Sequence, residues 1–208
     1  MRTIIWDLGG TLIDTYPDVD RALARAAFGD QAQSRVAEVA ALTRVSSGHA
    51  IEALAVRTGV PEEELSAAYD GVKDYWQHTP APVMAGAQEV MAAIRAAGGL
   101  NLVATHRDRS SAEQLITATG LAVDDMVCAP DGHPRKPSPA LIEALLQRHH
   151  LQPTDVLVVG DRPVDLEAGR AAGVDGALLV TPGIPLDAGA ARRIGDLREL
   201  LPLVSDPA

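Results

Sequence analysis

Basic residues are scarce in this chain, and no run of them forms a positively charged stripe. Its 208 residues include 18 lysines and arginines against 28 aspartates and glutamates, which gives a formal net charge of −10 at pH 7. Nucleic acids and anionic membranes attract positively charged surfaces, so neither is an expected partner. The only lysines are Lys73 and Lys136, and a compact ammonium differs chemically from the guanidinium groups used elsewhere.

Cysteine and long apolar runs are also nearly absent. The single cysteine, Cys128, excludes a disulfide within the chain and is typical of a reducing compartment. It lies in a short apolar segment, which favours a packed thiol over a reactive one. No apolar stretch approaches the length of a membrane span, and the first residues do not resemble a signal peptide. We therefore expect a cytoplasmic protein, and the lack of a coiled-coil pattern or apolar stripe predicts a monomer or weak homodimer.

The composition is that of a soluble globular protein, with 47% hydrophobic and 22% charged residues. Residues 19–78 show a helical pattern with no convincing strand. From about residue 80, helices alternate with short apolar runs at 100–105, 125–129, 156–160 and 177–180. This alternation is typical of a parallel sheet covered on both faces. The predicted fold is therefore α/β, a Rossmann-like core (1–14 and 80–208) with an inserted helical domain (15–79).

The start of the chain carries the first candidate functional residue. A short apolar run, residues 3–6, ends at Asp7 and is followed by Gly9 and Gly10. This pattern predicts a buried strand that presents one carboxylate in a loop, at the sheet edge where α/β proteins bind ligands. Taken alone, Asp7 could equally accept backbone N–H groups in a turn.

Four segments in order resemble the signature motifs of the haloacid dehalogenase-like hydrolases, most of whose members are Mg²⁺-dependent phosphatases. They are Thr3–Leu12, Leu102–Thr105, Arg135–Pro139, and Val156–Asp161 followed by Asp165. The resemblance covers nearly the whole chain and implies that the inserted helices form a mobile cap over the active site.

The resemblance also implies catalytic roles. Asp7 would attack phosphorus and form an aspartyl-phosphate, while Thr105 and Lys136 would bind the phosphate and neutralise its charge. The usual second Asp of the first motif, which acts as general acid and base, is replaced by Gly9.

Magnesium prefers hard oxygen ligands, and the resemblance implies a site for it. The ligands would be carboxylates of Asp7, Asp161 and Asp165 and the backbone carbonyl of Gly9. The substitution at position 9 keeps that carbonyl. Alternatively, Asp161 or Asp165 could cap the helix that follows.

Three interpretations of the missing acid remain open. Proton transfer by a positioned group is worth ~10²–10⁴ in rate, so its loss would slow the enzyme and favour leaving groups that need no proton, such as aryl or acyl phosphates. Alternatively, His106 or His49 could supply the proton. Dehalogenation is a third possibility, because the family's dehalogenases also lack this Asp, but they do not need the metal site.

The sequence also offers candidate substrate-binding residues, which are Gly10, His106, Arg44 and Ser47. Arg44 could bind a carboxylate or second phosphate, although an exposed helix arginine would be an ordinary explanation. We therefore predict an enzyme, a Mg²⁺-dependent hydrolase of a small phosphorylated metabolite. The alternative is a weak or inactive protein that binds such metabolites.

Overall fold

The computed structural model describes residues 3–189 and 191–205, and it divides into two compact units. The core unit comprises Met1–Ile13 and Val83–Ala208, and the helical unit comprises Asp14–Pro82. No helix among the described residues is both long enough and apolar enough to span a bilayer.

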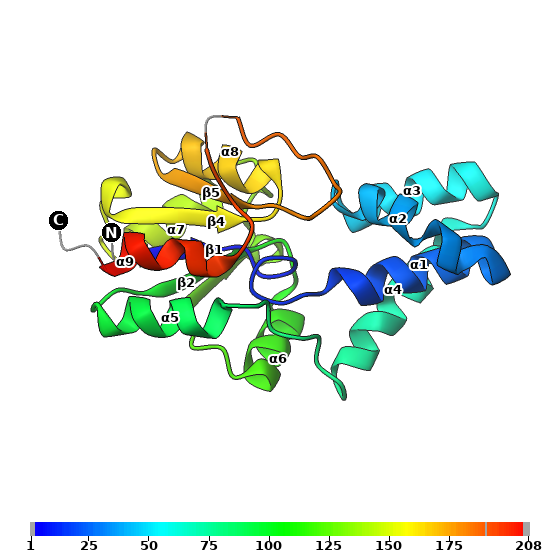
Figure 1. Ribbon diagram of the computed structural model, residues 1–208, viewed down its shortest axis with the longest axis horizontal. Helices are drawn as coiled ribbons and strands as arrows, with labels where there is room; N and C mark the ends of the chain where they lie inside the picture. The colour runs from blue at the N-terminus through cyan, green and yellow to red at the C-terminus, as the bar shows by residue number, and fades with distance from the viewer. Residues whose placement is uncertain (1–2, 190, 206–208) are drawn as a thin grey trace. The chain divides into compact units, whose positions relative to one another are not determined.

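The core unit is built on one parallel sheet, in the order β3-β2-β1-β4-β5-β6 (Figure 1). The strands are β1 (Thr3–Trp6), β2 (Asn101–Thr105), β3 (Asp125–Cys128), β4 (Val156–Gly160), β5 (Asp175–Leu179) and β6 (Arg192–Ile194). The predicted α/β class is therefore confirmed. All residues of β1, β2 and β4 are buried, as expected for central strands of a sheet covered on both faces.

Helices connect these strands and cover the sheet. They are α5 (Ala87–Ala96), α6 (Arg109–Thr119), α7 (Ala140–Arg148), α8 (Pro163–Ala171) and α9 (Leu201–Ser205). Apolar side chains of α7 and α8 pack with alternate residues of the central strands, such as Ile5 of β1 and Val158 of β4. Helices α5 and α6 lie on the opposite side of the sheet from α8 (Figure 1). Because helices bury both faces of the sheet, the ends of the strands that carry the candidate site are held in place.

The helical unit consists of α1 (Tyr16–Phe28), α2 (Ala32–Thr43), α3 (Ser47–Thr58) and α4 (Glu62–Trp76). Local signals set the ends of these helices. The Ser46 side chain accepts a hydrogen bond from the His49 N–H at 3.0 Å, and Gly59 ends α3 with a left-handed φ of 76°. Three glutamates in the first turn of α4 suit the positive end of the helix dipole.

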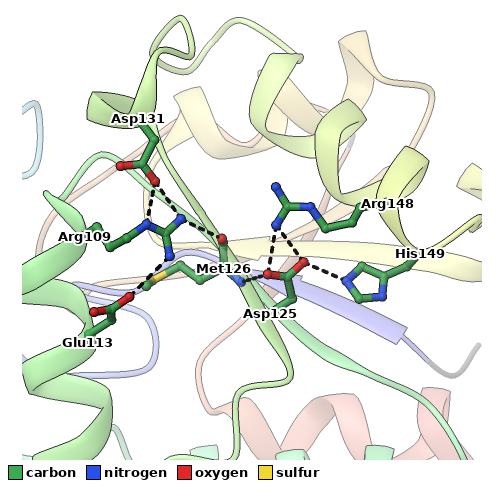
Figure 2. A network of polar contacts seen from close by, with 7 residues as sticks. All are labelled: Arg109, Glu113, Asp125, Met126, Asp131, Arg148 and His149. Atoms are coloured by element: carbon green, nitrogen blue, oxygen red, sulfur yellow. Dashed lines mark hydrogen bonds and ion pairs between the residues drawn. The ribbon is translucent and has the colours of Figure 1, made fainter.

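Polar side chains protect strand β3, which lies at one edge of the sheet (Figure 2). Arg109 donates to the Met126 carbonyl at 3.2 Å and pairs with Asp131. On the same strand, Asp125 accepts hydrogen bonds from Arg148 at 2.8 Å and pairs with His149. Covering an edge strand with charged groups disfavours pairing with another chain.

Two local features differ from the sequence-based expectations. Strand β6 was not predicted, because its three residues include two exposed arginines and only Ile194 is buried. Helix α8 begins at Pro163 with Arg162 as its N-cap, so Asp165 lies in its first turn and is not the N-cap that one alternative made it. Cys128 is buried, and burial raises the pKa of its thiol to about 11, in keeping with a packed side chain.

Candidate active site

Three carboxylates gather at the carboxyl edge of the sheet. Asp7 follows β1 and Asp161 follows the neighbouring strand β4, and the register pairs Trp6 with Val159. Asp165 lies in the first turn of α8. Each of the three aspartates is at most 4% exposed, and each offers one oxygen within 4.8 Å of the others. Three buried hard oxygen donors at this spacing fit a divalent cation such as Mg²⁺.

Lys136 joins two of these carboxylates. Its ammonium donates to Asp7 Oδ1 at 2.6 Å and to the Ala104 carbonyl at 3.0 Å, and it forms an ion pair with Asp165. The Lys136 side chain is 1% exposed, so these contacts exclude water. Two of the three ammonium protons are thus used in hydrogen bonds, and the ion pair with Asp165 adds a third contact.

Gly160 allows Asp165 to reach this cluster. A Cβ atom at position 160 would lie 2.3–2.5 Å from side-chain atoms of Asp165, closer than any side chain tolerates. The Asp165 carboxylate also accepts the Arg162 N–H at 3.1 Å, which holds it against the end of β4. The glycine before Asp161 is therefore a steric requirement of the cluster.

The charges of the site compensate one another. Burial raises the pKa of Asp7, and Lys136 only partly offsets this effect. Burial also opposes ionisation of Asp165, but Lys136 and Arg162 outweigh it and leave the pKa of Asp165 below its usual value. Burial disfavours the charged form of Lys136, whereas Asp165 and Asp7 raise its pKa, so the lysine stays protonated.

Thr105 ends β2, on the other side of β1 from β4. Its hydroxyl is buried and accepts the Arg107 N–H at 3.2 Å, which leaves the hydroxyl proton available to a ligand. Thr11, which we did not single out from the sequence, is fully buried and donates to Asp161 at 3.1 Å. Its position directly after Gly10 in the first motif could have identified Thr11 as a site residue from the sequence.

His106 holds the lysine segment in place. Its Nε2 accepts the backbone N–H of Lys136 at 2.7 Å, so that nitrogen carries no proton. Burial, followed by the nearby charges of Lys136 and Arg135, lowers the pKa of His106 to about 3. A neutral imidazole with its acceptor nitrogen occupied is unsuited to donate a proton at neutral pH, so the structure contradicts His106 as the substitute acid.

The first loop differs from expectation at Gly10. Its N–H donates to the Ile13 carbonyl at 2.7 Å, and its φ is 94°. The glycine closes the turn after β1, since few other residues adopt this conformation. The Gly10 N–H is therefore already used and is not available for the predicted contact with substrate. The backbone carbonyl of Gly9, a predicted metal ligand, lies in the same loop.

Two predicted substrate contacts belong to the helical unit. Arg44 is 7% exposed, so it is not the exposed arginine considered as its alternative. Its Nη1 pairs with Asp20 at 3.0 Å, its guanidinium lies 3.5 Å from the Tyr16 ring centre, and its buried Nε has no hydrogen-bond partner among the described residues. Ser47 is half-buried at the first residue of α3.

A parallel α/β sheet with three carboxylates and a lysine at its carboxyl edge offers groups of the kind that phosphoryl transfer requires. The model of the haloacid dehalogenase-like hydrolase family matches residues 1–173. The chain therefore belongs to this family.

Relatives of similar sequence include proteins that are named as phosphatases. A phosphoglycolate phosphatase from Vibrio vulnificus is 27% identical over 83% of this chain and 81% of its own length. An N-acetylmuramic acid 6-phosphate phosphatase from Pseudomonas aeruginosa is 30% identical over 83% of this chain and 79% of its own. The fold is similar to the crystal structure of a predicted phosphoglycolate phosphatase from Haemophilus somnus, with a TM-score of 0.76, 20% identity, and coverage of 99% of this chain and 98% of that one.

Proposed function

We propose that this protein is a cytoplasmic Mg²⁺-dependent phosphatase that acts on a small phosphorylated metabolite. The observation that carries this proposal is the buried group formed by Asp7, Asp161 and Asp165 with Lys136. A scaffold protein would gain little from burying three carboxylates around one ammonium, because desolvating charges is costly. The phosphatase activity of the curated relatives supports the same reaction class.

In this proposal Asp7 is the nucleophile. One of its oxygens would attack phosphorus and form an aspartyl-phosphate, while the other would help to hold the metal. Asp161, Asp165 and the Gly9 carbonyl would be the remaining protein ligands of Mg²⁺. When bound, the cation would neutralise charge on the phosphate and on the carboxylate that approaches it.

Lys136 and Thr105 would bind the phosphate. The ammonium would move part of its hydrogen bonding from Asp7 to a phosphate oxygen as the carboxylate is consumed, and the free hydroxyl proton of Thr105 would reach a second oxygen. His106 would act as a positioning residue through its hydrogen bond to the Lys136 N–H. Both donors are buried and therefore arranged before the substrate binds.

The helical unit would act as the cap that selects the substrate. Arg44 would bind a carboxylate or second phosphate, with Ser47 as a further contact. Phosphoglycolate and N-acetylmuramic acid 6-phosphate, the substrates named for two relatives, each carry a carboxylate besides the phosphate.

A weak or inactive binding protein is the second candidate, supported by the glycine at position 9. Dehalogenation is less favoured, because that reaction has no use for the group of three carboxylates. We expect a monomer or weak homodimer in either case.

The test is hydrolysis of p-nitrophenyl phosphate and a panel of sugar and carboxylic acid phosphates with Mg²⁺. The wild type should turn over at least one of them, and Asp7→Asn should abolish turnover while leaving the fold intact by circular dichroism. Turnover that survives in Asp7→Asn would contradict the proposed nucleophile. Binding of the same compounds without turnover would favour the binding protein.

A further inference from the structure

Among the described residues of the core unit, Lys136, Asp161 and His106 are the ionisable candidates for a proton donor, and all three are engaged in other contacts, which limits the substrate. The Lys136 ammonium donates to Asp7 and to the Ala104 carbonyl and forms an ion pair with Asp165. Asp161 accepts a hydrogen bond from Thr11 and belongs with Asp7 and Asp165 to the group that fits a cation. In these contacts the carboxylates act as hydrogen-bond acceptors.

Positions 9 and 106, from which a proton donor was expected, do not supply one either. Gly9 has no side chain. His106 uses Nε2 to accept the Lys136 N–H at 2.7 Å and is neutral. The structure thus excludes His106, which belongs to the core unit, as a substitute for the missing general acid.

This arrangement treats two kinds of phosphate differently. An alkyl phosphate releases an alkoxide, which is a strong base, so its departure needs a proton. An acyl phosphate releases a carboxylate, whose conjugate acid has a pKa of about 4, so departure needs none. The two kinds of phosphate therefore differ in whether a general acid must protonate the leaving group as it departs.

We infer that the substrate is an acyl phosphate, the mixed anhydride of a small carboxylic acid and phosphoric acid. This inference rests on the proposed phosphatase function and narrows its substrate class. In the first step an Asp7 oxygen forms a bond to phosphorus, the bond between phosphorus and the acyl oxygen breaks, and the electron pair leaves with the carboxylate. In the second step water adds to phosphorus, the bond to Asp7 breaks, and both protons of the water remain on the released phosphate.

The size-matched pair acetyl phosphate and ethyl phosphate tests this inference. We compare kcat/KM for the two compounds, with Mg²⁺ and correction for spontaneous hydrolysis, in the wild type, Gly9→Asp and Gly9→Asn. The quantity kcat/KM reports the first irreversible step, in which the leaving group departs. Because Gly9 does not have a left-handed φ, the backbone accepts either side chain.

The wild type should strongly prefer acetyl phosphate. Gly9→Asp should raise kcat/KM for ethyl phosphate by ~10²–10⁴ and narrow the preference for acetyl phosphate by at least ~10², because it supplies the missing acid. Gly9→Asn has a similar shape without an acidic proton and should not narrow the preference.

Other results would overturn the inference. Comparable kcat/KM for both compounds in the wild type would show that a proton donor is present, and equal gains for both compounds in Gly9→Asp would show that the leaving group is not the limiting factor. Hydrolysis of ethyl but not acetyl phosphate, lost in Asp7→Asn, would overturn the inference and leave the phosphatase proposal intact. Acetyl phosphate hydrolysis that survives in Asp7→Asn would overturn both, and no turnover of either compound, with turnover of other phosphates, would overturn the inference alone.

Discussion

Lys136 donates a 2.6 Å hydrogen bond to Asp7 while it also pairs with Asp165, so one buried ammonium serves two carboxylates. Breaking a buried ion pair by removing one partner leaves an uncompensated charge. This relationship makes Lys136 important to the stability of the core unit as well as to phosphate binding.

Replacing Lys136 with Met should therefore destabilise the protein by about 3–5 kcal/mol. Mg²⁺ should raise the melting temperature of Lys136→Met more than that of the wild type, because the cation replaces the lost positive charge and ligands stabilise the state that binds them. Thermal unfolding with and without Mg²⁺ measures both effects. Lys73→Met is the matched control, since Lys73 forms a partly exposed pair with Asp70 and lies over the Tyr69 ring, and its loss should cost less than about 1 kcal/mol. Equal costs for the two lysines would contradict the buried arrangement.

Gly160→Ala should remove activity and lower stability. Its methyl group would lie 2.3–2.5 Å from side-chain atoms of Asp165 and would push that carboxylate out of the cluster. The control is Gly71→Ala in the middle of α4, where a Cβ meets nothing within 4 Å, and it should stabilise the protein by about 0.5–1 kcal/mol. Denaturant unfolding and Mg²⁺ titration by calorimetry test the pair. Normal Mg²⁺ affinity in Gly160→Ala would show that Asp165 is not a ligand.

His106 should make stability depend on pH. Its pKa falls from 6.5 to about 3 on folding, so the folded state binds fewer protons than the unfolded state between these values. Its contribution to stability is complete above pH 6.5 and is lost as the pH falls toward 3. His106→Gln should flatten this part of the melting temperature profile, and exposed His78→Gln should not. The pH–rate profile of the wild type should also lack a titration from His106 between pH 5 and 8.

Arg44 should contribute to both stability and substrate affinity. Arg44→Ala leaves Asp20, which is 3% exposed, without its counter-charge and should destabilise the protein by about 3–5 kcal/mol. Arg44→Lys keeps a positive charge but loses the planar, two-pronged donor, so it should raise KM for substrates with a second anionic group. Thermal unfolding and KM for 2-phosphoglycolate against p-nitrophenyl phosphate separate these roles. An equal change of KM for both compounds would contradict the proposed contact.

His49 remains the histidine from the sequence that could still supply a proton, and it belongs to the helical unit. If the core unit alone performs the chemistry, His49→Ala should leave kcat/KM for ethyl phosphate unchanged. A loss specific to ethyl phosphate, with acetyl phosphate unaffected, would identify His49 as the donor.

The amino-acid sequence determined the α/β class, the family, and which residues form the carboxylate cluster. It could do so because short apolar runs between helices force a parallel sheet, and residues that end parallel strands must meet at one edge. Asp7 and Asp161 come together because β1 and β4 are also neighbours in the sheet, which the tertiary structure decides. Strand β6 was missed because one buried residue, Ile194, leaves almost no apolar pattern.

The tertiary structure decided which of these residues are available for chemistry. The pattern of the sequence shows neither that the His106 acceptor is taken by the Lys136 N–H, nor that Arg44 is buried against Asp20. Hydrogen-bond partners distant in the chain depend on how segments pack, and packing has no local signature in the sequence. Only the folded chain therefore shows that the acid missing at Gly9 is not replaced by His106.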